Sequence, residues 1–114
     1  MSAITTHVLD LASGRPAAGV VVLLERRDAT GRFCEVGGGA TDADGRLKTL
    51  LRPDSGLVPG TWRLTFQTGA YFANAGITSF HPEVIVAFEV GDASQHYHVP
   101  LLVSPFGYTT YRGS

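Results

Sequence analysis

Residues 61–67, TWRLTFQ, alternate large apolar side chains with polar ones along the chain. The apolar set is Trp62, Leu64 and Phe66. A period of two is typical of a strand that has one face in a core and the other face exposed. This stretch therefore predicts a half-buried strand, with Trp62 in the core of a β-rich fold.

Two further runs have strand character. Residues 20–24, VVVLL, form a continuous apolar run, which predicts a strand covered on both faces, either by the domain itself or by a second subunit. Residues 83–90 place Val84, Val86, Phe88 and Val90 on one side. The helical candidate is the short stretch 68–75, which Gly76 is placed to end.

Turn signals separate these runs along the whole chain. Clusters of Gly, Pro, Asp and Ser recur roughly every 8–16 residues, a pattern that favours an all-β sandwich or barrel. We expect strands near residues 3–9, 19–27, 32–40, 46–49, 61–67, 83–90, 95–103 and 106–112. The triplet Gly37-Gly38-Gly39 indicates a strand that bends or lies close to another backbone.

Composition narrows the class of protein. The chain of 114 residues has the size of one domain, which we place at residues 1–114. Its net charge of −1 gives no support for nucleic acid or an anionic membrane as a partner. No apolar stretch is long enough to span a membrane, and no signal peptide is visible. The single cysteine, Cys34, cannot form an internal disulfide, so a cytoplasmic location is expected.

The histidines are the first candidates for chemistry, although a histidine in a strand is more often structural or solvated than catalytic. His96 and His98 share one strand face, a spacing compatible with a shared metal, but no second His or Cys pair accompanies them. We therefore predict no metal site. His7 points outward if its alternating neighbours in residues 4–8 face the core. Arg46 follows a turn, and from that segment alone it is an ordinary exposed arginine.

The C-terminal segment is unusual for a chain end. Residues 104–114, SPFGYTTYRGS, contain three aromatic side chains among strand-forming residues, whereas termini are usually polar and frayed. We expect this tail to be held in a sheet. Tyr111, Arg112 and Ser114 then take definite positions.

Four segments together carry a family resemblance. They are residues 6–10 with 14–17 (THVLD and GRPA), residues 41–46 (TDADGR), residues 96–102 (HYHVPLL) and residues 111–114 (YRGS). The sequence resembles the transthyretin-related 5-hydroxyisourate hydrolases of urate breakdown. The resemblance runs from one end of the chain to the other, and the tail is its most specific element.

That resemblance implies a transthyretin-like (prealbumin-like) sandwich of about eight strands in two sheets with one short helix. It implies a homotetramer, a dimer of dimers, with active sites at the dimer–dimer interface. It implies hydrolysis of 5-hydroxyisourate to 2-oxo-4-hydroxy-4-carboxy-5-ureidoimidazoline without metal or organic cofactor. The residues implied are His7, Arg46, His98 and Ser114 for catalysis, His7, Arg46 and Tyr111 for substrate binding, and His96, Arg112 and Gly113 in support.

These residue types suit the hydrolysis of a cyclic amide. Histidine accepts and returns a proton near neutral pH, and arginine stays charged while its planar fork of donors meets carbonyl oxygens. Which of His7 and His98 is the base stays open at this point. Two alternatives also remain, a transthyretin-like carrier of small molecules and a structural prealbumin-like module. The polar set His7, Arg46 and His98 and the YRGS tail favour the hydrolase.

Overall fold

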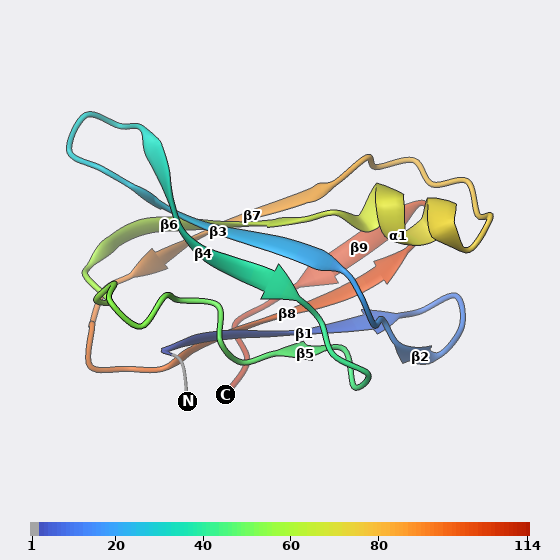
Figure 1. Ribbon diagram of the computed structural model, residues 1–114, viewed down its shortest axis with the longest axis horizontal. Coiled ribbons are helices and arrows are strands. Elements are labelled where there is room, and N and C mark those ends of the chain that lie inside the picture. The colour runs from blue at the N-terminus through green and yellow to red at the C-terminus, as the bar shows by residue number, and fades with distance from the viewer. Residues whose placement is uncertain (1–2) are drawn as a thin grey trace.

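The computed structural model describes residues 3–114 as two stacked β-sheets and one short helix (Figure 1). The first sheet consists of β1 (Ile4–Asp10), β2 (Arg15–Pro16), β5 (Arg46–Leu47), β8 (Tyr97–Ser104) and β9 (Gly107–Thr110). The second sheet, in spatial order, consists of β4 (Phe33–Ala40), β3 (Val21–Arg27), β6 (Gly60–Phe66) and β7 (Val84–Val90). The helix α1 (Thr68–Asn74) lies at one end of the sandwich. The prediction of an all-β, two-sheet sandwich with one short helix is confirmed.

The core lies between the two sheets. Trp62, Leu64 and Phe66 of β6 are fully buried, as their alternation predicts. From the first sheet, Ile4 and Val8 of β1 are buried against them. Each such side chain contributes roughly 1.5–3 kcal/mol relative to an exposed one. Because the other face of β1 is turned away from this core, His7 lies on the outer face of the sheet, as expected.

Most strand ends differ from the prediction by one or two residues, and three of the differences bear on the fold. The two-residue strand β2 lies outside the predicted strand ranges; it folds back on the end of β1 and pairs Pro16 with Leu9. The strand expected at 46–49 stops at Leu47, because the chain then crosses to the second sheet, where Leu51 bridges to Gly37. The strand expected at 106–112 stops at Thr110.

Pro100 explains the early end of β9. The antiparallel ladder between β8 and β9 ends at the pair Leu101 and Thr110, immediately before Pro100, which has no N–H to donate. Thr110 Oγ1 donates instead to the Pro100 carbonyl oxygen at 2.8 Å. Beyond the proline the pairing resumes in the same register, as a single bridge between His98 and Gly113. The tail is therefore held against the sheet beyond the strand itself.

The apolar run 20–24 is covered on one face only within this chain. Val20, Val22 and Leu24 are buried, whereas 55% of Val21 is exposed. The expectation of cover on both faces is therefore not met by the chain itself. Cover from a second subunit stays a prediction.

The glycine triplet in β4 does allow a close backbone approach. A Cβ on Gly37 would lie 1.8 Å from the carbonyl oxygen of Leu50, and Gly38 has a φ of +153°. Both positions exclude a larger side chain. The prediction from the triplet is confirmed.

The helix α1 is tied to the first sheet by a side chain. Tyr71 Oη donates to Asp10 Oδ2 at 2.8 Å, and Asp10 Oδ1 accepts the backbone N–H groups of Ala12 and Ser13. Burial and the neighbouring carboxylate raise the pKa of Tyr71 to about 12. The helix ends just before Gly76, as predicted. Within residues 3–114, no helix has the length and apolar character needed to cross a membrane.

Candidate active site

Strand pairing brings distant polar residues onto one face of the first sheet. β5 runs antiparallel to β1 and places Arg46 opposite His7. β8 runs parallel to β1 and places His98 opposite Thr5. Since Thr5 and His7 are two residues apart on one strand, their side chains share the outer face. Register alone therefore gathers residues 5, 7, 46 and 98 into one cluster.

The C-terminal tail joins this cluster through backbone and side-chain contacts. The Gly113 N–H donates to the His98 carbonyl oxygen at 2.8 Å. The Arg112 guanidinium donates to Gln95 Oε1 at 2.9 Å and lies 4.5 Å from the centre of the Tyr97 ring. These contacts hold the tail beside β8 and position Ser114 at the cluster.

A pocket of about 240 Å³ opens between these groups. Its lining residues are Thr5, Arg46, Lys48, His96, His98 and Ser114. Four of the residues named in the sequence analysis, Arg46, His96, His98 and Ser114, thus meet at one cavity. His7 lies beside it, opposite Arg46, with Nε2 2.8 Å from the carbonyl oxygen of Asp44.

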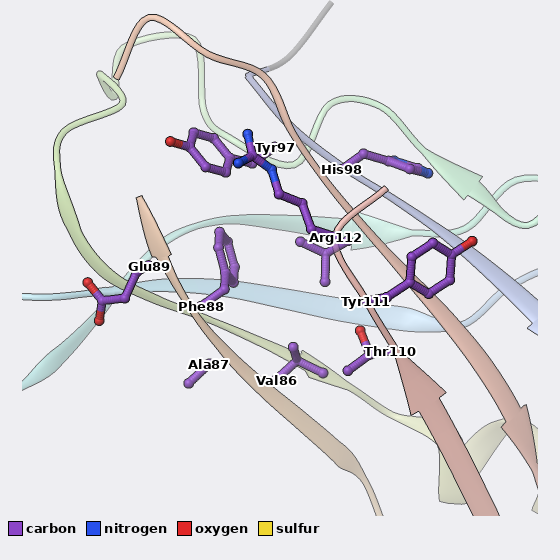
Figure 2. A pocket seen from close by; sticks show the side chains of 10 residues that line it. Val86, Ala87, Phe88, Glu89, Tyr97, His98, Thr110, Tyr111 and Arg112 are labelled. Atoms are coloured by element: carbon purple, nitrogen blue, oxygen red, sulfur yellow. The ribbon is translucent and has the colours of Figure 1, made fainter. Parts of the chain in front are cut away.

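Tyr111 and Arg112 belong to a neighbouring cavity instead. That cavity has a volume of about 320 Å³ and lies between β7 and the tail, with Val86 and Phe88 opposite Tyr111 (Figure 2). His98 lines both cavities. In a single chain the structure therefore does not bring Tyr111 into the pocket that holds Arg46 and Ser114.

One hydroxyl joins the two histidines of β8. Thr5 Oγ1 lies 2.9 Å from His96 Nε2 and 2.8 Å from His98 Nδ1. The expectation that both imidazoles share a face is confirmed, and a threonine lies between them. In the described part of the chain, no three His, Cys, Asp or Glu side chains gather as they would around a metal ion.

The electrostatics of the pocket favour a neutral His98. Burial lowers the pKa of His98 below its usual value, and so do the Arg46 charge and the neighbouring His96 and His7, whereas a hydrogen bond with the Thr5 backbone raises it. A neutral imidazole at neutral pH has a free lone pair. His98 is thus in the protonation state that a general base requires.

Thr5 and Lys48 also line the pocket, although no motif in the sequence points to either residue. Strand alternation could have identified both residues, because side chains two positions apart on a strand share a face. Thr5 lies two residues before His7, and Lys48 lies two residues after Arg46. The remaining histidine, His81, is half-buried and packs edge-on against Phe80 and Tyr108.

Known proteins of similar sequence and fold cover almost the whole of this chain. Curated relatives include the 5-hydroxyisourate hydrolase of Caulobacter vibrioides, which is 48% identical over 120 residues and covers all of both chains. Among solved structures, 5-hydroxyisourate hydrolase from Klebsiella pneumoniae is 38% identical, with a TM-score of 0.84 over 100% of both chains. Sea bream transthyretin in complex with thyroxine is 32% identical, with a TM-score of 0.90 over 98% of this chain and 95% of that one.

The family assignment covers nearly all of the described residues. Residues 4–113 match the HIUase/Transthyretin family, a span that includes both sheets, the helix and the tail as far as Gly113. Relatives and solved structures agree with that match over almost the full length. The chain belongs to the HIUase/Transthyretin family.

Proposed function

We propose that this protein is an enzyme that hydrolyses 5-hydroxyisourate to 2-oxo-4-hydroxy-4-carboxy-5-ureidoimidazoline, without a metal or organic cofactor. The observation that carries the proposal is the convergence of Arg46, His98 and Ser114 on one pocket, with His7 beside it. The similar proteins from Caulobacter vibrioides and Klebsiella pneumoniae, both described as 5-hydroxyisourate hydrolases, support the choice of substrate.

His98 is the general base in this mechanism. Its lowered pKa keeps it neutral, so it takes a proton from water as the water attacks a ring carbonyl. Ser114, in the same pocket, holds that water. The protonated His98 then returns the proton to the leaving ring nitrogen. General base catalysis of this kind supplies about 10²–10⁴-fold in rate.

Arg46 and His7 bind the substrate and the charge that develops on it. The guanidinium of Arg46 remains cationic and offers paired N–H donors to the oxyanion, and one well-aimed donor contributes roughly 3–4 kcal/mol. His7, held by the Asp44 carbonyl oxygen, presents its ring beside Arg46. Tyr111 contacts the substrate only if assembly brings it to this pocket from a neighbouring chain.

The proposed assembly is a homotetramer, a dimer of dimers, with the sites at the dimer–dimer interface. The pocket lies on the outer face of the first sheet, where a second copy would close it. Among the described strands, β7 and β9 each lie at one edge of their sheet, and 48% of Ile85 on β7 is exposed. Edges of this kind are surfaces that subunits cover.

We propose that the protein is located in the cytoplasm. Cys34 is a free, exposed thiol on the edge strand β4. An exposed free thiol suits a reducing compartment.

The carrier alternative differs in the chemistry of the pocket rather than in the backbone. Sea bream transthyretin has a similar backbone, with a TM-score of 0.90. In this chain, however, the pocket holds Arg46, Lys48 and two histidines, charged and polar groups that an apolar ligand has no means to pair with.

The test uses freshly generated 5-hydroxyisourate and follows its ultraviolet decay with the purified protein. We expect rapid decay that His98→Gln abolishes and that the control His81→Phe leaves unchanged. Activity should survive exhaustive chelation, whereas a loss restored by zinc would contradict the cofactor-independent mechanism. Decay no faster than in buffer would reject the hydrolase and return the carrier and the structural module as the candidates.

A further inference from the structure

The Thr5 hydroxyl is shared between two imidazole rings, which restricts the protons of both. It lies 2.9 Å from His96 Nε2 and 2.8 Å from His98 Nδ1, and only 5% of Thr5 is exposed. Within residues 3–114, these two nitrogens are its hydrogen-bond partners. A hydroxyl has one hydrogen to donate, and a neutral imidazole has one N–H and one bare nitrogen.

Only two proton arrangements satisfy all three groups. In the first, His98 Nδ1–H donates to Thr5 Oγ1, and the Thr5 hydroxyl donates to a bare His96 Nε2. In the second, His96 Nε2–H donates to Thr5, and Thr5 donates to a bare His98 Nδ1. If both rings donate, the hydroxyl hydrogen has no acceptor, which is costly because only 5% of Thr5 is exposed. If neither ring donates, one ring nitrogen has no donor among these three groups, and only at the exposed His96 can water supply one readily.

The two rings present different nitrogens to Thr5, and this gives the coupling a definite form. In the first arrangement both histidines carry the proton on Nδ1, and in the second both carry it on Nε2. We infer that Thr5 is a positioning residue that holds His96 and His98 in the same tautomer, the Nδ1–H form, and so keeps His98 Nε2 bare. The coupling itself is independent of the proposed function, while the choice of the Nδ1–H pair rests on it, because a base needs a bare Nε2.

Among the residues that line the pocket, the group placed to orient the His98 ring is the Thr5 hydroxyl, because no carboxylate is present there. A carboxylate usually orients a catalytic histidine. In this pocket the other charged side chains are Arg46 and Lys48, His7 lies alongside, and no Asp or Glu is among the lining residues described. When His98 accepts a proton on Nε2, its Nδ1–H continues to donate to Thr5. The bond to Thr5 is therefore the same before and after the transfer.

Nitrogen-15 NMR of the histidine rings tests the coupling directly, with resonances assigned through His96→Gln and His98→Gln. Above the titration range we expect both His96 and His98 in the Nδ1–H form. A mixed pair of tautomers, or the Nε2–H form at both, overturns the inference. This measurement needs only the folded protein, so it tests the inference about the tautomers even if the protein does not hydrolyse 5-hydroxyisourate.

Variants at Thr5 distinguish the effect of its hydroxyl from the effect of its side-chain shape. Thr5→Val should release His98 to the Nε2–H form that predominates in free histidine, and Thr5→Ser should restore Nδ1–H. The matched control is Thr6→Val, which removes a buried hydroxyl that donates to the Val99 carbonyl oxygen on the other face of β1. This control should leave both tautomers unchanged.

Kinetics then connect the tautomer to turnover. For Thr5→Val we expect kcat to fall at least about 10-fold with little change in KM, and Thr5→Ser to recover it, because the base and not the binding contacts is affected. An equal loss in Thr5→Ser, or a loss that appears only in KM, contradicts the positioning role. If Thr5→Val does not fold, the wild-type spectrum and Thr5→Ser still decide the question.

Discussion

Gly113 lies against the ring of His98 with no room for a side chain. Its N–H donates to the His98 carbonyl oxygen at 2.8 Å, and a Cβ at this position would lie 2.5 Å from His98 Cδ2. The glycine thus lets the tail approach β8 closely enough for Ser114 to reach the pocket. The ring of His98 is in turn fixed between Gly113 on one side and Thr5 on the other.

Gly113→Ala should therefore damage catalysis more than folding. The added methyl group must push the His98 ring or the tail away, and a misplacement of about 1 Å at a catalytic group costs on the order of 10²-fold in rate. Steady-state kinetics and thermal unfolding would be measured together. The matched control is Gly91→Ala, where a Cβ meets no heavy atom within 4 Å. Unchanged turnover in Gly113→Ala would show that the tail tolerates displacement.

Activity should have an acidic limb that lies below the ordinary histidine range. Burial and the Arg46 charge lower the pKa of His98, so the neutral base persists at neutral pH and is lost only as the pH falls through that lowered value. The plot of log kcat/KM against pH should therefore be flat near neutrality and fall in acid. A limb at or above the usual histidine pKa of about 6.5 would contradict the assignment of His98 as the base.

Removing the charge of Arg46 separates its two effects. Arg46→Gln should lower kcat by roughly 10²–10³-fold, because an oxyanion donor is lost. It should also raise the pKa of His98, since a nearby cation no longer opposes protonation. Histidine NMR titration measures the second effect without substrate. The control is Arg27→Gln at the exposed end of β3, which should change neither quantity.

The sequence predicts which face of a strand is buried, because that depends on the alternation of apolar and polar residues. It does not predict which residues lie opposite one another on neighbouring strands, because that depends on the pairing register. The period of two in residues 61–67 identified the buried face of β6, and the same rule placed His7 on the outer face of β1. No local pattern reveals that β8 lies parallel to β1 with His98 opposite Thr5. The hydroxyl between the two histidines therefore became visible only in the fold.

The position of the C-terminal tail could also be predicted only in part from its own sequence. The aromatic content of the tail correctly predicted that it is held in a sheet. Pro100, however, ends the ladder at Thr110, and the pairing resumes only at Gly113. Tyr111 lies opposite that interruption and faces the cavity beside β7 (Figure 2). A proline on the neighbouring strand decides this, and reading the tail alone does not reveal it.

The bond between Tyr71 and Asp10 should matter for stability and not for catalysis. Tyr71→Phe removes a partly buried donor to a carboxylate that also accepts two backbone N–H groups. Hydrogen bonds to charged groups contribute about 1.5–3 kcal/mol, so we expect a loss of that order in the free energy of unfolding. Urea denaturation measures it, with the exposed Tyr108→Phe as control. A large fall in turnover under folding conditions would instead link α1 to the site.

Deleting residues 111–114 should separate folding and assembly from catalysis. The strand β9 ends at Thr110, so its whole ladder with β8 survives the deletion, and the buried core loses none of its members. What is lost is the bridge from Gly113 to His98, the contacts of Arg112 with Gln95 and Tyr97, and Ser114 itself. We therefore expect a folded oligomer of unchanged order, measured by light scattering, whose hydrolysis of 5-hydroxyisourate is reduced by about 10²-fold or more. The shorter control deletes Ser114 alone and should lose turnover while keeping the bridge at Gly113. Full activity in the longer deletion would remove the tail from the site, and an active monomer at assay concentration would remove the shared interface.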